Sequence, residues 1–355
     1  MNRIGIVGAG AWGTALALTA YRAGRQVMLW VHNPNTAALL VTHHESPYLP
    51  GIRVPLENGT LYLTTDPAVI TATCDAIFLA VPAQYLRAVC TKFAPYWRAG
   101  TPAIICAKGI ERDTNALMHE IIGETLPTAT VAVLSGPSFA AEVARGLPTA
   151  LTLACQDRGL GLTLLKTLGT QALRLYLSQD ILGAEIGGTV KNVLAIGCGI
   201  VKGRSLGDNA RAALITRGLA EIVRLAIAVG AQAETLMGLS GLGDLILTAN
   251  STQSRNFAFG VALGQGHNFS QLLASRCSVT EGVYSAAGVV ARAEALSVEM
   301  PVCQAVRSIL DQGEPIDEVI HSLLTRPFRT ETSVMDCEQG IVRNMCYCWH
   351  RAVQG

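Results

Sequence analysis

Charged and aromatic residues are scarce in this sequence. Of its 355 residues, 15% are charged and 5% are aromatic, and the formal net charge is +1. Nucleic-acid-binding proteins cluster Lys and Arg on one face, and no basic stripe stands out here, so we expect no nucleic-acid partner. Half of the residues are hydrophobic, which is ample for a large core, and the length suits two domains of ordinary size.

Long unbroken apolar runs are missing too, although the mean hydropathy of +0.35 is high for a soluble protein. Residues 4–21 are interrupted by glycines, and residues 125–141 by Pro127 and Pro137. A spanning helix needs about 20 apolar residues without such breaks, so we expect no integral membrane span. The excess of apolar residues fits strands that are buried on both faces and a second core rich in helices.

A secretory signal peptide is the competing interpretation of the N-terminus. Arg3 precedes an uncharged stretch, and Ala15-Leu16-Ala17 resembles a small-residue cleavage site. Four glycines within ten residues would interrupt the helix of such a peptide, and a regular α/β pattern continues beyond it. We therefore favour a folded role for this stretch.

The ten cysteines include no C-x-x-C pair. Most of them are scattered through strand and helix patterns, and scattered buried thiols are typical of a reducing cytoplasm. The tail is the exception, because Cys346, Cys348 and His350 follow Cys337 closely. This spacing matches no tetrahedral zinc pattern, so we predict no metal site and keep a metal-binding tail as the alternative.

Strand and helix patterns alternate in the first half of the chain, and helix patterns alone follow from about residue 179. The expected strands are residues 3–7, 26–31, 76–81, 103–107, 131–134 and 149–154. The expected later helices are residues 181–203, 209–228, 235–239, 255–263, 285–296 and 302–310. This order predicts an α/β fold with a Rossmann-type, mostly parallel sheet domain followed by an all-helical C-terminal domain. We place the dinucleotide-binding domain at residues 1–180, the helical substrate and catalytic domain at 181–326, and an appended tail of unknown order at 327–355.

The first expected strand runs directly into a G-x-G-x-x-G motif, and an expected helix follows it. In this context Gly8 permits the tight turn, Gly10 lets the backbone approach a pyrophosphate, and Gly13 lets the helix pack closely on the sheet. The phosphates would lie at the helix N-terminus. Loops after three further strands, at residues 81–82, 108–109 and 135–138, should converge on the same crevice, because ligands of such sheets bind at the carboxyl ends of the strands.

Lys191 stands out as a candidate acid and base, because it precedes a run without charge, residues 193–201. Burying an unpaired ammonium is costly, and burial together with a second cation, such as Lys108, would lower its pKa towards the working range. The alternative is an ion-paired lysine, or one that extends its ammonium to the solvent.

Two further clusters carry both a structural and a functional interpretation. Asp244 follows several small residues and could simply cap a helix. Ser254, Arg255 and Asn256 begin another helix pattern, where free N–H groups and a guanidinium would suit a phosphate. An ordinary capped helix is the alternative for this second cluster.

With these motifs the chain resembles the bacterial-type NAD(P)-dependent glycerol-3-phosphate dehydrogenases over about residues 3 to 326. The motifs that carry the resemblance lie at residues 8–15, 107–111, 134–140, 187–192, 241–245, 253–256 and 281–282. The resemblance implies reversible hydride transfer between NAD(P)H and dihydroxyacetone phosphate, giving sn-glycerol 3-phosphate for phospholipid synthesis. It also implies a cytoplasmic enzyme, commonly a homodimer.

The resemblance implies the following site. Lys191 would be the general acid and base, supported by Asn192 and Thr248. The substrate would be held by Lys108, Gly136, Ser138, Lys191, Asp244, Ser254, Arg255 and Asn256. Besides the loop glycines, the cofactor would touch Ala11, Trp12, His32, Lys108, Ala140, Arg255, Val279 and Glu281.

The end of the second expected strand bears on the choice between NAD and NADP. An NAD-selective fold usually places Asp or Glu there to bind the ribose 2′-OH, but residues 30–33 read Trp-Val-His-Asn. A 2′-phosphate would not be repelled and His32 could face it, so we predict that NADP(H) is accepted, alongside NAD. The alternative is that His32 is only a surface residue of the loop.

Two other functions stay open at this point. One is a relative with the same two-domain plan that reduces a 2-keto or 3-keto acid, which would need an acid-binding site instead of residues 254–256. The other is a redox sensor that binds a dinucleotide without catalysis, although a sensor has no need for Lys108 and Lys191 in a crevice.

Overall fold

An eight-stranded sheet organises the first half of the chain in the computed structural model, which describes residues 1–56, 59–274 and 279–327. The strands are β1 (Arg3–Val7), β2 (Gln26–Trp30), β5 (Leu61–Thr64), β6 (Ala76–Leu79), β7 (Pro102–Ile105), β8 (Thr130–Ser135), β9 (Thr149–Cys155) and β10 (Leu173–Ser178). Their spatial order is β10-β9-β8-β7-β6-β1-β2-β5. The six strands from β5 to β8 are parallel and have the order found in dinucleotide-binding folds.

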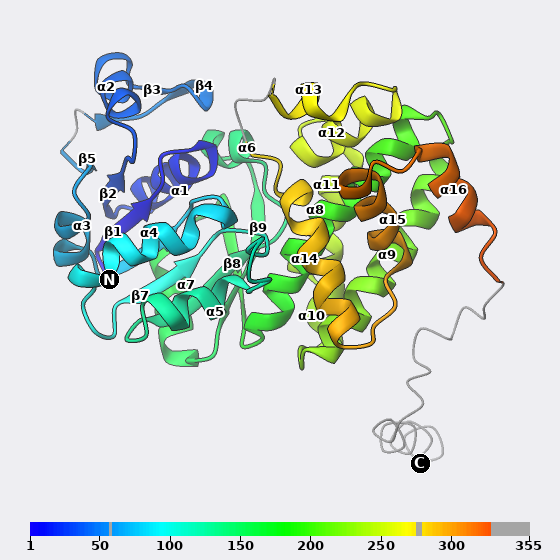
Figure 1. Ribbon diagram of the computed structural model, residues 1–355. Coiled ribbons are helices and arrows are strands. Elements are labelled where there is room, and N and C mark those ends of the chain that lie inside the picture. The colour runs from blue at the N-terminus through cyan, green and yellow to red at the C-terminus, as the bar shows by residue number, and fades with distance from the viewer. Residues whose placement is uncertain (57–58, 275–278, 328–355) are drawn as a thin grey trace, which may run out of the picture.

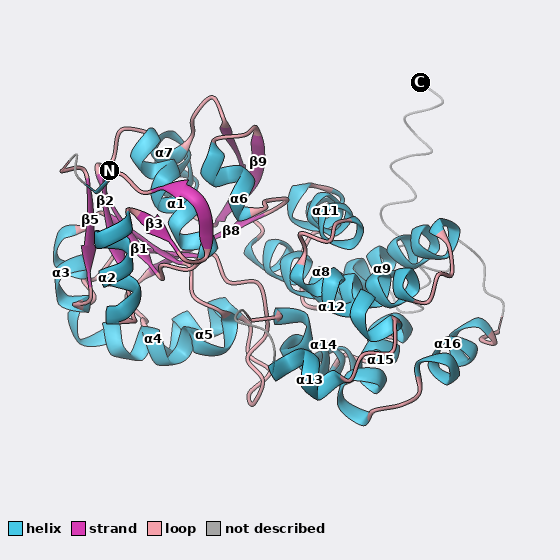
Figure 2. Ribbon diagram, turned by 90° about the horizontal axis from the view of Figure 1, so that it is seen from above, coloured by secondary structure: helices cyan, strands magenta, loops and turns pink. Residues whose placement is uncertain are grey.

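Helices cover both faces of this sheet (Figure 2). They are α1 (Ala11–Arg22), α2 (Pro34–His43), α3 (Pro67–Thr73), α4 (Leu86–Phe93), α5 (Met118–Thr125), α6 (Ala140–Arg145) and α7 (Arg158–Leu168), with short 3₁₀ turns at Ala83–Tyr85 and Ala94–Tyr96. Side chains alternate along β1, so Ile4 and Ile6 pack in the same core as Leu16 of α1, whereas Val7 packs in the same core as Ile70 of α3. Burial on both faces explains why the strands read as continuous apolar runs. We call this part, residues 3–178, the sheet region.

The second half of the chain is helical and lies beside the sheet region (Figure 1). Its helices are α8 (Ile181–Gly203), α9 (Asp208–Ala228), α10 (Ala233–Met237), α11 (Asp244–Asn250), α12 (Arg255–Gly264), α13 (Phe269–Ala274), α14 (Glu281–Ala295), α15 (Pro301–Arg307) and α16 (Ile316–Leu324), with π turns at Leu239–Gly243 and Ser308–Gln312. We call this part, residues 181–324, the helical region.

Helix α8 is the central element of the helical region. A Cβ added at Gly199 would lie 2.2 Å from the carbonyl oxygen of Phe257, and one at Gly260 would lie 2.0 Å from that of Ile196. The backbones of α8 and α12 therefore touch, which only glycine permits at these points. Within the described residues, α8 is the one helix with the length and apolarity to cross a membrane, but its apolar window is 100% buried inside the protein.

The predicted fold class is confirmed, with corrections in detail. The sheet is mostly parallel, as predicted; the exception is that β9 pairs antiparallel with β8, and β10 then runs parallel to β9. Strands β5 and β10 and the small β3 (Glu45–Ser46) and β4 (Leu49–Arg53) hairpin were not predicted, nor were α13 and α16. Helix α11 begins at Asp244, where the helix-cap interpretation expected a helix. The expected helix at 285–296 begins four residues earlier, at Glu281. The cysteines and histidine of the tail lie outside the described residues.

Candidate active site

The G-x-G-x-x-G segment forms a tight loop between β1 and α1. Gly8 has φ +110°, and a Cβ on Gly13 would lie 1.8 Å from the carbonyl oxygen of Gly8. A Cβ on Gly10, in contrast, would meet no described atom within 4 Å. Gly10 is also the N-cap of α1, and no described side chain caps this helix. The loop therefore leaves open space and N–H groups where a pyrophosphate can approach.

Two buried polar atoms of expected cofactor residues, one beside this loop and one at the start of α14, fit a bound dinucleotide. Trp12 Nε1 and Glu281 Oε2 are buried without a hydrogen-bond partner in the described part of the chain. Buried donors and acceptors normally have partners, and a ligand with complementary groups would supply them. Trp12 packs in one apolar cluster with Ala11 of α1 and Ala140, the first residue of α6. The structure thus gathers three of the residues expected to contact the cofactor.

The other expected cofactor residues come from separate elements. His32 is exposed in the loop after β2, with its ring 5.5 Å from that of Trp30. Val279 is partly buried just before α14, which begins at Glu281. Glu281 Oε1 accepts a hydrogen bond of 3.0 Å from the backbone N–H of Ala83 in the sheet region. Burial raises the pKa of Glu281 to about 7, although the Ala83 bond and the charge of Arg255 oppose the shift.

Two lysines share one buried carboxylate at the junction of the two regions. Lys108, from the loop after β7, donates to Asp244 Oδ2 at 2.7 Å and to the carbonyl oxygen of Gly136 at 2.9 Å. Lys191, on α8, donates to Asp244 Oδ1 at 2.9 Å and to Thr248 Oγ1 at 2.8 Å. Asp244 stands at the first position of α11, but its carboxylate holds the lysines and does not cap the helix. Lys191 is therefore ion-paired, as the alternative interpretation expected.

Burial and charge adjust the proton affinities of this trio. The pKa of Lys191 is lowered to about 8, chiefly by burial; the charges of Lys108 and Arg255 add to this shift, and Asp244 opposes it. Burial alone would raise the pKa of Asp244, but the two lysines outweigh burial and hold that pKa below its usual value. Asp244 thus stays ionised, while Lys191 can gain or lose a proton close to neutral pH.

A chain of buried amides joins this trio to two other helices. Asn192 donates to the carbonyl oxygen of Lys108 at 3.0 Å, and Asn256 donates to Asn192 Oδ1 at 2.9 Å. The backbone N–H of Gly282 in turn donates to Asn256 Oδ1 at 2.9 Å. The second hydrogen of the Asn256 amide could be donated to a substrate.

The remaining substrate candidates surround the same junction. Ser138 Oγ donates to the carbonyl oxygen of Gly136 at 3.0 Å, so this oxygen accepts from both Ser138 and Lys108. Ser254 accepts a bond of 3.2 Å from the N–H of Phe257, as the capped-helix alternative expects, and its own hydroxyl hydrogen is left to donate. Arg255 is the exposed first residue of α12.

Two contacts at the junction were not foreseen from the sequence. The Ala83 N–H that binds Glu281 carries no side-chain signal, because it depends on how the loop after β6 meets α14. Thr189 Oγ1 donates to the carbonyl oxygen of Gly109 at 3.2 Å, and its place within the 187–192 motif could have suggested such a role. Among the described residues, no group of three or more His, Cys, Asp or Glu could hold a metal ion.

Comparisons with known proteins agree with this arrangement. The family model described as NAD-dependent glycerol-3-phosphate dehydrogenase N-terminus matches residues 3–160, and the corresponding C-terminus model matches residues 180–321. Glycerol-3-phosphate dehydrogenase, NAD(P)+, of Rhodospirillum rubrum is 53% identical over 332 residues, which cover 93% of this chain and 94% of that protein. The enzyme of the same description from Paramagnetospirillum magneticum is 61% identical over 260 residues, or 73% of this chain and 93% of its own.

Solved structures agree as well. The crystal structure of glycerol-3-phosphate dehydrogenase from Coxiella burnetii aligns with a TM-score of 0.87 at 39% identity, over 92% of this chain and 99% of that one. A ketopantoate reductase from Ralstonia eutropha shares the fold alone, at a TM-score of 0.53 and 15% identity. The chain belongs to the family of NAD(P)-dependent glycerol-3-phosphate dehydrogenases.

Proposed function

We propose that Lys191 is the general acid and base in the interconversion of dihydroxyacetone phosphate and sn-glycerol 3-phosphate. The chain is an NAD(P)-dependent oxidoreductase of this specificity by its family. The observation that carries the role of Lys191 is its buried ammonium, which is held by Asp244 and Thr248 and has a pKa of about 8. A group that titrates close to neutral pH can both give and accept the proton of a reversible reaction.

NAD(P)H, when bound, supplies the hydride that the C2 carbon receives. Protonated Lys191 then gives its proton to the oxygen on C2, and in the reverse direction the neutral amine takes that proton back. Lys108 adds a positive field where negative charge develops on this oxygen. Asp244 orients both ammonium groups, because each binds a separate oxygen of its carboxylate.

We assign the phosphate of the substrate to the N-terminus of α12. Ser254, Arg255 and Asn256 stand in its first turn, where N–H groups and a guanidinium favour an anion. Lys108, Gly136, Ser138 and Asp244 would hold the rest of the molecule beside Lys191. The cofactor would occupy the loop of Gly8, Gly10 and Gly13 and touch Ala11, Trp12, His32, Lys108, Ala140, Arg255, Val279 and Glu281.

Replacing Arg255 with alanine should chiefly raise the KM for dihydroxyacetone phosphate. A guanidinium on a phosphate makes a charge-assisted bond in substrate and transition state alike, and losing it costs about 2 kcal/mol, or roughly 30-fold in KM. The measurement is NADPH oxidation over a substrate panel that includes unphosphorylated dihydroxyacetone and 2-keto acids. An unchanged KM in Arg255→Ala, or a wild-type preference for a keto acid, would contradict the assignment.

We expect NADPH to be accepted, and to be preferred over NADH. His32 is exposed at the end of β2, and residues 30–33 contain no carboxylate to repel a 2′-phosphate. The test is kcat/KM with each cofactor in the wild type and in His32→Ala. A strong wild-type preference for NADH would contradict the predicted preference for NADPH. If His32→Ala leaves the ratio of the two kcat/KM values unchanged, His32 does not contribute to the choice of cofactor.

The boundary between the two domains follows from where the sheet region ends and the helical region begins. We place the dinucleotide-binding domain at residues 1–180 and the substrate domain at 181–326, since β10 ends at Ser178 and α8 begins at Ile181.

We further infer a cytoplasmic homodimer that serves phospholipid synthesis, in keeping with the family. The helical region exposes large apolar side chains that a partner copy could cover, including Ile227, Met237, Ile246 and Leu324. Sedimentation that shows only monomers at micromolar concentration would exclude the dimer.

A further inference from the structure

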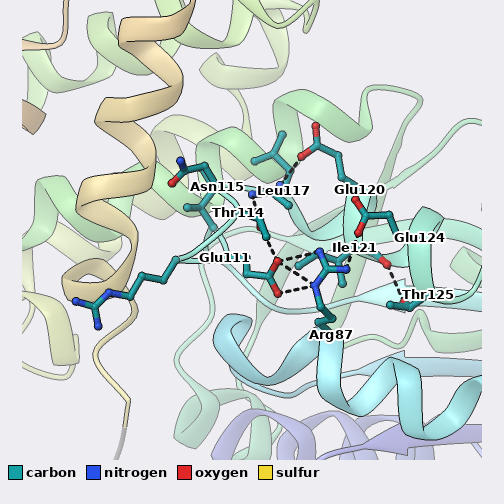
Figure 3. A network of polar contacts seen from close by, with 12 residues as sticks. Arg87, Glu111, Thr114, Asn115, Leu117, Glu120, Ile121, Glu124 and Thr125 are labelled. Atoms are coloured by element: carbon teal, nitrogen blue, oxygen red, sulfur yellow. Dashed lines mark hydrogen bonds and ion pairs between the residues drawn. The ribbon is translucent and has the colours of Figure 1, made fainter.

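A short segment links Lys108 to α5 and runs between the two regions. Residues 109–120, which we call the strap, leave the active site at Gly109, form a bridge between Ile110 and Leu117, and include the first three residues of α5. Figure 3 shows its polar contacts from close by. The strap is bound from both sides, so it connects the position of Lys108 to that of the helical region.

The sheet region holds the strap through Arg87 of α4. Arg87 donates to both oxygens of Glu111, with its Nε at 2.9 and 3.0 Å and its Nη2 at 2.8 Å, and its Nη1 reaches Glu124 of α5 at 2.5 Å (Figure 3). Thr114 Oγ1 also donates to Glu111 at 2.5 Å. These bonds attach the strap to the sheet region, and none of them involves a residue of the helical region.

The helical region holds the other end of the strap through two helices. Glu185 of α8 accepts the backbone N–H of His119 at 2.9 Å, and its second oxygen lies 2.5 Å from His119 Nδ1. Arg292 of α14 makes two bonds to Glu120, at 2.7 and 2.8 Å, and one to the carbonyl oxygen of Asn115 at 2.9 Å. Glu185 is only 4% exposed, whereas the His119 side chain is 28% exposed, so the carboxylate side of the contact is the buried one.

The charges around His119 favour a protonated imidazole opposite Glu185. Burial alone would lower the pKa of His119, but Glu185 and, more weakly, Glu120 outweigh burial and raise it, with Arg292 opposing. Burial raises the pKa of Glu185. The raised pKa of His119 favours an imidazolium opposite Glu185, although burial of Glu185 opposes its charged form. The charged contact is present below the ordinary histidine pKa and is lost as the pH rises through the raised value.

We propose that Glu185 and His119 are positioning residues that hold α8, and with it Lys191, in place against the strap that carries Lys108. Glu185 lies six residues before Lys191 on one continuous helix, and His119 lies eleven residues after Lys108 along the strap. The Lys108–Asp244–Lys191 contacts are made across the same junction. A small shift of α8 relative to the strap would therefore change the distance between the two ammonium groups and admit water. Neither residue touches the reacting atoms.

The chain offers a matched control in Glu221. This carboxylate of α9 is 1% exposed and also accepts two bonds, from the N–H groups of Val302 and Cys303 at 2.7 and 3.1 Å. All of its partners lie in the helical region, whereas Glu185 binds across the junction. Glu221→Gln therefore disturbs a buried carboxylate without disturbing the junction.

The experiment compares Glu185→Gln, His119→Ala and Glu221→Gln by thermal unfolding and by the pH dependence of kcat/KM for dihydroxyacetone phosphate. A misplacement of about 1 Å can cost up to about 100-fold in rate, and we expect roughly a tenfold loss of kcat in each junction variant. Because burial is the largest cause that lowers the pKa of Lys191 to about 8, the apparent pKa of the profile should rise in both. Glu221→Gln should lose stability but keep the wild-type profile.

Several outcomes decide the matter. Wild-type kcat and pH profile in a folded Glu185→Gln, or in His119→Ala should Glu185→Gln not fold, overturn the proposal. An equal shift of the apparent pKa in Glu221→Gln would also overturn the proposal, because the shift would then come from a general loss of stability. The proposal rests on Lys191 as acid and base. If Lys191→Met retains turnover, that assignment fails, whereas an inactive Lys191→Met with unaffected junction variants refutes only the positioning role.

Discussion

Replacing Lys191 with methionine is expected to lower kcat by about 10³-fold, the typical contribution of a general acid and base, while the protein stays folded. Methionine matches the length of the lysine stem and fills the same buried space. Asp244 keeps its bond to Lys108, so the variant leaves no carboxylate buried without a cation. Cofactor binding should persist, because the glycine loop at the start of α1 is untouched. NADPH oxidation measures the first effect, and NADPH fluorescence on binding measures the second.

Lys202 provides the matched control on the same helix. It is exposed in the last turn of α8, so Lys202→Met makes the same substitution without reaching the junction. We expect wild-type turnover there. Near-normal turnover in Lys191→Met would refute the assignment, and a comparable loss in both variants would trace the effect to the stability of α8.

The parts of the fold that could be predicted were those with a strong local pattern. The bounds of β1 and α8 agree with the prediction to the residue. The apolar run of β1 ends at the glycine loop, and α8 begins directly after its N-cap, Asp180. The rule that ligands bind at the carboxyl ends of parallel strands predicted that Lys108 lies near the loop after β8, and in the structure it donates to the carbonyl oxygen of Gly136 in that loop. Its contact with Asp244 agrees with that expectation.

Strands β10 and β5 were not predicted, for different reasons. Residues 173–178 alternate apolar and polar side chains, so the signal for β10 was present. β5 has only four residues and lies at the edge of the sheet, where Tyr62 is 48% exposed, and such a strand carries little pattern. The reversed direction of β9 leaves no mark in hydrophobicity, because both strand directions bury the same side chains.

The roles of the charged residues were hardest to predict, since they depend on partners far along the chain. Asp244 looked like a helix cap because its lysine partners lie 53 and 136 residues away in sequence. Glu185 carried no signal of its own, and its partner His119 lies 66 residues earlier. Local patterns thus located the elements of the site but not its ion pairs.

Replacing Asp244 with asparagine should be the most damaging single change at the junction. Two ammonium groups lie 2.7 and 2.9 Å from its two oxygens, and an amide offers only one oxygen and turns an NH₂ group towards the other lysine. Removing one partner from a buried ion pair typically costs about 3–5 kcal/mol. Part of that loss is avoided if Lys191 gives up its proton, so thermal unfolding should show a loss below this range at alkaline pH.

The pH profile separates this role from a purely structural one. In the wild type, reduction of dihydroxyacetone phosphate needs protonated Lys191, so kcat/KM should fall as the pH rises through about 8, and oxidation of glycerol 3-phosphate should fall as the pH drops through the same value. The Asp244 charge raises the pKa of Lys191, so Asp244→Asn should move both transitions to lower pH, opposite to the shift expected for Glu185→Gln. Asp317→Asn, which breaks an exposed pair with Arg204, should move neither. Unmoved transitions in a folded Asp244→Asn would mean that this carboxylate holds the lysines in place without setting the proton affinity of Lys191.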